Sequence, residues 1–100
     1  MNLFALPPGP LAEERSEILA RGGNVRVERI VSTGQTTDWY DQEETEFVSV
    51  LQGEATLEFE DGGQRRLEAG DWLVLPPHRR HRVAATSGDP ACIWLCMFWT

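Results

Sequence analysis

Two short apolar runs, far apart in the sequence, each bring an ionisable side chain to the end of a predicted strand. Glu46 opens an apolar run that stops at Gly53, and its alternation and β-branched residues favour a strand entering a turn. The second run, residues 72–75, is stopped by two prolines and followed by His81. If the two strands pair or face each other, a carboxylate and an imidazole converge. Such a pair suits metal binding or proton transfer.

The residues around both runs follow regular spacings. The first series is Gly34, five residues, Tyr40-Asp41-Gln42, three residues, Glu46, six residues and Gly53, and the second is Gly70, five residues, Pro76, His78 and His81. Both series resemble the two signature motifs of the cupin superfamily, whose members are small double-stranded β-helix barrels. The resemblance extends from about Asn24 to the C-terminus. It implies an all-β fold, a cupin or jelly-roll barrel.

The resemblance also indicates where a metal would bind. In metal-binding cupins, two histidines and a glutamate of the first motif and the histidine of the second hold a divalent ion. This chain keeps Glu46 and His81, but Tyr40 and Gln42 stand where the two histidines belong. A phenol and an amide are weaker ligands than imidazole. The candidate metal ligands are therefore Gln42, Glu46 and His81, and the candidate cofactor is a loosely held divalent ion.

Three kinds of activity fit this set of side chains. One is metal-dependent oxygenase or isomerase chemistry. The second is a metal-free isomerase with His81 as base and Tyr40 as acid, an arrangement similar to that of some cupin-like sugar epimerases, with Glu46 orienting the imidazole. The third, which we expect, is binding of a small molecule inside the barrel. The ligand-binding residues would be Trp39, Tyr40, Gln42 and Arg80.

Other charged residues near the motifs have structural interpretations. His78 stands where the second motif has glycine, and we expect it on the surface, although an inward position would make it an additional ligand. The arginines at 79, 80 and 82 either meet an anionic group of the ligand or pair with nearby acids. Arg26 and Glu28 are expected to be outward residues of a strand.

A single domain is expected, in which residues 1–23 form an N-terminal extension and residues 24–100 the barrel. Pro10 suits the first position of a short helix that reaches about Arg21, because two glutamates follow in the first turn and Gly22 provides an end. The predicted helix carries only a thin apolar stripe. It should therefore lie on the outside of the barrel.

The last predicted strand, residues 91–99, is apolar on both faces. One face can fill the barrel, and the other needs cover from the N-terminal helix or from a second copy of the chain. The pattern therefore predicts a homodimer that uses this outer face.

Charge and hydropathy exclude two classes of partner. The formal charge of −7 argues against a nucleic-acid-binding surface, which needs a basic patch. No apolar run is long enough to cross a bilayer, and the first ten residues lack the basic and apolar segments of a secretory signal. Cys92 and Cys96 would lie about 13 Å apart on one strand, too far for a disulfide. We therefore expect a cytoplasmic protein that binds neither nucleic acid nor membranes.

Overall fold

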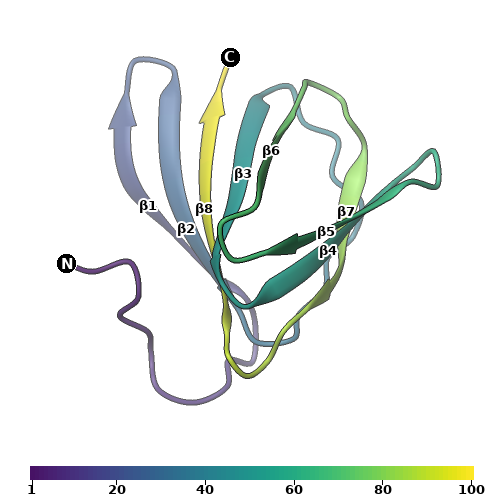
Figure 1. Cartoon of the computed structure of the whole chain (residues 1–100). Coiled ribbons are helices and arrows are strands. Elements are labelled where there is room, and N and C mark those ends of the chain that lie inside the picture. Colours follow the sequence, from purple (N-terminus) through teal and green to yellow (C-terminus); the bar gives the residue numbers. More distant parts are fainter.

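The computed structural model describes all residues, 1–100, and contains eight strands. They are β1 (Arg15–Gly22), β2 (Val25–Ser32), β3 (Thr45–Gln52), β4 (Glu54–Phe59), β5 (Gln64–Glu68), β6 (Trp72–Leu75), β7 (His81–Thr86) and β8 (Cys92–Trp99). One sheet has the order β1-β2-β8-β3-β6 and the other β5-β4-β7, and the paired strands are antiparallel. Figure 1 shows the two sheets as two layers, with β3 passing directly into β4. The all-β fold predicted from the sequence is confirmed.

The predicted helix from Pro10 to about Arg21 is wrong. Residues 15–22 instead form β1, which pairs with β2 as the outer strand of the larger sheet. Helical signals at the start of a segment are weak when its apolar stripe is thin, and the backbone of β2 supplies an alternative set of hydrogen bonds. A register shift between Ile18 and Ala20 also interrupts the alternation that would have revealed the strand.

Gly53 makes the tight passage from the larger sheet to the smaller one possible. Its φ of +78° is in the left-handed region, and a Cβ there would lie 2.4 Å from the side-chain oxygen of Ser87 and 2.9 Å from the carbonyl oxygen of Ala91. Only glycine avoids both the backbone strain and the clash. This glycine fixes how β4 continues from β3 and so how the two sheets face each other.

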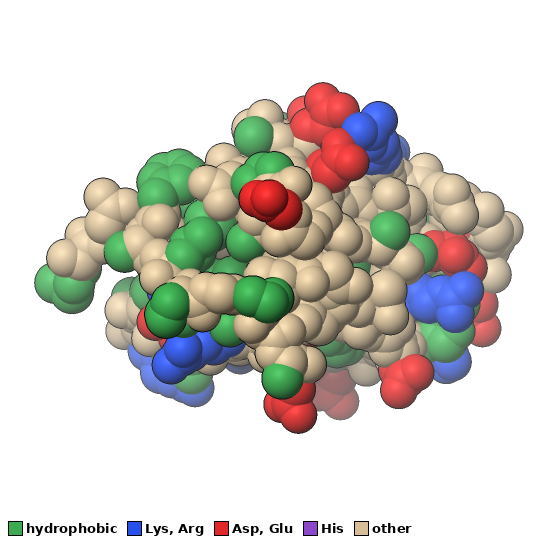
Figure 2. Space-filling model, turned by 90° about the horizontal axis from the view of Figure 1, so that it is seen from below, with side chains coloured by type: hydrophobic (Ala, Val, Ile, Leu, Met, Phe, Trp, Pro, Cys, Tyr) green, Lys and Arg blue, Asp and Glu red, His purple; other side chains and the backbone are tan.

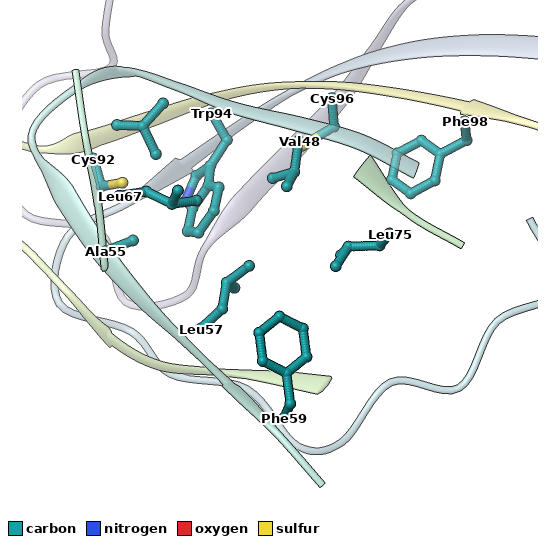
Figure 3. Close-up of a cluster of buried hydrophobic side chains, with 11 residues drawn as sticks. Val48, Ala55, Leu57, Phe59, Leu67, Leu75, Cys92, Trp94, Cys96 and Phe98 are labelled. Atoms are coloured by element: carbon teal, nitrogen blue, oxygen red, sulfur yellow. The ribbon is translucent and has the colours of Figure 1, made fainter. Parts of the chain in front are cut away.

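The space between the sheets holds a continuous apolar core. Eleven buried residues form this cluster: Val48, Val50, Ala55, Leu57, Phe59, Leu67, Leu75, Cys92, Trp94, Cys96 and Phe98. Figure 3 shows side chains of β4, such as Leu57 and Phe59, pointing toward those of β3, β6 and β8. Both cysteines are free and buried. The core therefore joins the two sheets.

The opposite side of the larger sheet is also apolar, and we call it the outer face. It is defined by the row Val27, Met97, Phe47 and Val74, which are neighbours across β2, β8, β3 and β6, together with Trp72. Trp72 and Val74 are 60% and 45% exposed, and Trp72 stacks on the Phe47 ring.

The N-terminal segment covers a different part of the larger sheet. Arg29 donates hydrogen bonds to the carbonyl oxygens of Leu3 and Ala5, and the backbone N–H of Leu11 donates to the Thr33 hydroxyl. Figure 2 shows hydrophobic side chains gathered on the side where this segment lies. Trp72 and Val74 remain exposed on the other sheet edge, at β6.

A membrane-spanning helix, which would need a long apolar stretch, is not among the elements of this fold.

Candidate functional site

A cavity of about 220 Å³ lies between the two sheets. Its sixteen lining residues, nine of them hydrophobic, are Glu14, Ser16, Arg26, Glu28, Ile30, Tyr40, Gln42, Glu46, Val48, Leu57, Leu75, His81, Val83, Trp94, Cys96 and Phe98. Six of the hydrophobic residues also belong to the core cluster. The cavity is therefore an unfilled part of the core with a few polar groups at its wall, as is usual for small-molecule sites.

Tyr40 and His81 are brought together by the backbone. The backbone N–H of Tyr40 donates to the carbonyl oxygen of His81 at 2.6 Å, and the backbone N–H of His81 donates to the carbonyl oxygen of Tyr40 at 3.1 Å. This isolated antiparallel bridge ties the loop before β3 to the start of β7. The two rings lie 5.5 Å apart. The structure therefore brings these two candidate site residues together, and both line the cavity.

His81 is held in one tautomer. Its Nδ1 lies 2.7 Å from the carbonyl oxygen of Arg79, which can only accept a hydrogen bond, so Nδ1 carries the proton and Nε2 is a free acceptor. The residue is only 4% exposed. Burial lowers the pKa of His81, and the hydrogen bond to the Arg79 carbonyl opposes this only in part. The imidazole is therefore neutral near pH 7.

Glu46 is a buried carboxylate without a cationic partner. It is the second residue of β3, is 7% exposed, and accepts a hydrogen bond of 3.1 Å from the Gln42 amide. The Nε2 of His81 is 4.0 Å from Glu46 Oε1, beyond hydrogen-bonding distance. Burial raises the pKa of Glu46 to about 7, and the hydrogen bonds from Gln42 and the Cys96 thiol offset only part of that effect.

Three charged residues of the cavity were not predicted as site residues. Arg26 and Glu28, expected to point outward, instead line the cavity, because it is Val27 that faces outward on β2. Arg26 pairs with Glu28, donates to Glu44 at 2.7 Å and lies 4.3 Å from the centre of the Phe98 ring. The alternation of charged and apolar residues along β2 shows that they lie on opposite faces of the sheet. It does not show which face is inward, and the usual pattern places the valines there.

The third unpredicted residue is Glu14, which reaches the cavity from the segment just before β1. No ion pair holds its carboxylate, and burial raises its pKa. Burial, together with the charge of Glu14, raises the pKa of Tyr40. Glu14 lies in the segment that the sequence pattern predicts as an outer helix, so the pattern contains no signal that would bring it to the cavity.

Trp39 and Arg80, expected to bind the ligand, do not line the cavity. Arg80 and Arg82 lie over the Trp39 ring, at 5.7 and 4.6 Å from its centre. Each of the three arginines near His81 has an acidic neighbour: Arg79 with Asp61, Arg80 with Glu60 and Arg82 with Glu58. These arginines therefore form surface pairs and contribute no free positive charge to the cavity.

His78 lies on the surface and not in the cavity. Its Nδ1 lies 2.7 Å from Asp41 Oδ1 on the surface, and its backbone has a φ of 61°. A left-handed backbone at this position explains why the second cupin motif has glycine there.

The donor set does not fit a tightly held metal ion. No three His, Cys, Asp or Glu side chains lie close enough together to hold one. Of the three candidate ligands, Glu46 and His81 face each other, while Gln42 presents its amide nitrogen to Glu46 rather than an oxygen. Two strong donors are fewer than the three or four that protein metal sites supply.

Comparison with known proteins places this geometry in context. The model of the family described as "Cupin domain" matches residues 27–98. A crystal structure named a "putative mannose-6-phosphate isomerase" from Ralstonia eutropha JMP134 is 38% identical, with a TM-score of 0.92 over 99% of this chain and 95% of that one. A search of curated protein sequences finds no match.

Two more distant structures share the fold. A cupin superfamily protein from Desulfitobacterium hafniense is 21% identical, with a TM-score of 0.79 over 93% of this chain and 83% of that one. The DMSP lyase DddQ from Ruegeria pomeroyi is 19% identical, with a TM-score of 0.74 over 87% of this chain and 47% of that one. At these identities the likeness concerns the fold alone.

The burial of Glu46 predicts a pH-dependent effect of Glu46→Gln on stability. Between pH 4.5 and 7 the folded state keeps a proton on Glu46 that the unfolded chain releases, so the free energy of unfolding falls as pH rises through this window. The glutamine is neutral at every pH. Urea unfolding should show equal stabilities at pH 4.5 and a gain for Glu46→Gln of up to about 3 kcal/mol at pH 8.

Glu60→Gln is the matched control, because Glu60 is an exposed carboxylate outside the cavity. It should leave the pH dependence of the wild type unchanged. Parallel curves for the wild type and Glu46→Gln would contradict the buried, unpaired state of Glu46.

Proposed function

Because the chain belongs to the cupin domain family, we propose that its cavity binds a small molecule. The observation that carries the proposal is the cavity itself, which combines mostly hydrophobic walls with Tyr40, Gln42, Glu46 and His81 at one side. Buried polar groups without full hydrogen bonding are costly to stability and are kept where a ligand completes them. Divalent metal binding at Gln42, Glu46 and His81 is the weaker proposal, because only two strong donors are present.

The proposal predicts where fragments will bind. In a screen of small-molecule fragments by ¹H–¹⁵N NMR, binders should shift the amides of Tyr40, Glu46 and His81, whereas those of Trp72 and Val74 on the outer face should not move. A fragment at about one hundred times its Kd should stabilise the fold by about 2.7 kcal/mol. Binding confined to the outer face, or none in the screen, would contradict the proposal.

Isomerase activity is a second candidate, favoured by two observations. Tyr40 and His81 lie side by side, with His81 neutral and able to accept a proton and Tyr40 protonated and able to donate one. The Ralstonia eutropha relative, 38% identical, carries the name of a mannose-6-phosphate isomerase. In this scheme the sugar would lie in the cavity, within reach of the Tyr40 hydroxyl and the His81 Nε2.

The isomerase candidate predicts loss of turnover in Tyr40→Phe. With mannose 6-phosphate as substrate and NMR as the assay, the variant should be slower by about a hundredfold or more, because the phenol proton is lost while the ring remains. Trp39→Phe, next in sequence but outside the cavity, should keep the wild-type rate. No turnover by the wild type, or equal rates in the two variants, would exclude this candidate.

We also propose that the protein is a homodimer that uses the outer face. The argument is the exposure of Trp72 and Val74 beside Phe47 and Met97, because apolar patches of this kind in soluble proteins mark interaction sites. Two such faces are self-complementary when related by a two-fold axis.

Light scattering tests the dimer. The wild type should have twice the 11.3 kDa mass of one chain, and Val74→Glu should shift it toward the monomer because a charge would be buried in the interface. Gln64→Glu adds the same charge to the smaller sheet and should leave the mass unchanged. A wild-type monomer at every concentration would rule out the dimer.

A further inference from the structure

At pH 8, where Glu46 is ionised, the cavity wall carries two hydrogen-bond acceptors, on His81 and Glu46, with no donor between them. The Nε2 of His81 carries no proton, because Nδ1 donates to the Arg79 carbonyl. Glu46 Oε1, which in the ionised carboxylate is also an acceptor, lies 4.0 Å from Nε2. Both residues are more than nine-tenths buried and line the cavity. A group that donates to both would complete their hydrogen bonding.

The charges of the lining also call for a cation. Three carboxylates, those of Glu14, Glu28 and Glu46, line the cavity against a single guanidinium. That guanidinium, on Arg26, is fully engaged by Glu28 and Glu44 and by the face of Phe98. The half-buried Glu14 and the buried Glu46 therefore have no positive partner, and burial makes an unpaired carboxylate costly.

The walls favour an organic cation over a metal ion. Nine of the sixteen lining residues are hydrophobic, and they include the rings of Trp94 and Phe98. No three side chains of the kinds that bind metals lie together. Burying the hydrocarbon part of an organic ligand against these apolar side chains is favourable, whereas apolar side chains provide no ligands for a hydrated metal ion.

We propose that the ligand is a small organic ammonium ion whose N–H groups donate to Glu46 and to His81 Nε2, while its hydrocarbon part packs against Leu57, Trp94 and Val83. The inference rests on the proposed function, because it names the ligand class of the same cavity. An anion such as a sugar phosphate would face three carboxylates and no free cation. The ammonium proposal therefore also argues against the isomerase candidate.

Three probes that share one ring and differ in their head group test the proposal. Cyclohexylamine carries an ammonium, cyclohexanol a hydroxyl and cyclohexanecarboxylate a carboxylate at pH 8. Isothermal titration calorimetry should show the amine binding about tenfold or more tightly than the alcohol, the effect of one charge-assisted hydrogen bond. The carboxylate should not bind.

Variants assign the preference to named carboxylates. Glu46→Gln should reduce the affinity for the amine to about that for the alcohol, and unchanged alcohol binding will show that the cavity is still folded. Glu14→Gln should weaken amine binding to a smaller extent, because Glu14 is only half-buried. Glu60→Gln, a surface carboxylate, should leave all three affinities unchanged.

The outcomes separate this inference from the proposed function. If the alcohol or the carboxylate binds as tightly as the amine, or if Glu46→Gln binds the amine as the wild type does, the ammonium proposal is overturned while the cavity remains a ligand site. If none of the three probes binds, the small-molecule function fails as well.

Discussion

The site depends on one constraint, the burial of a carboxylate that the protein does not pair with a cation. Glu46 lies 93% covered between two sheets, and its hydrogen-bonding neighbours, the Gln42 amide and the Cys96 thiol, carry no charge. Burial without a cationic partner raises its pKa to about 7, because the charged form is disfavoured there. A fold selected for stability alone would pair such a group or replace it, so the unpaired acid supports the proposal that this cavity is a binding site.

The rest of the architecture holds this acid in position. Gly53 turns β3 directly into β4 and so sets the two sheets face to face, while the mutual hydrogen bonds of Tyr40 and His81 tie the loop before β3 to the start of β7. The Arg79 carbonyl then fixes the His81 tautomer. Backbone hydrogen bonds between segments far apart in the sequence therefore position Tyr40 and His81 on the polar wall of the cavity.

The sequence predicted the parts of this structure that depend on local pattern and motif spacing. The strands, the turn glycines and the convergence of Glu46 with His81 follow from alternation and from the two cupin motifs. The N-terminal strand was missed because its bulge hides the alternation, and with it Glu14 was lost. Arg26 and Glu28 were expected to point outward, because charged residues on the inward face of a strand are unusual. Their inward position is explained by contacts that the sequence does not reveal, those of Arg26 with Glu44 and with the Phe98 ring.

The account can be tested most directly by measuring the pKa of Glu46 itself. In protein labelled with ¹³C at glutamate side chains, the carboxyl resonance of Glu46, assigned by comparison with Glu46→Gln, can be followed through a pH titration. We predict a midpoint near 7, well above the ordinary glutamate value of 4.5. A midpoint near 4.5 would mean that water or a cation stabilises the ionised carboxylate, and it would contradict the central claim.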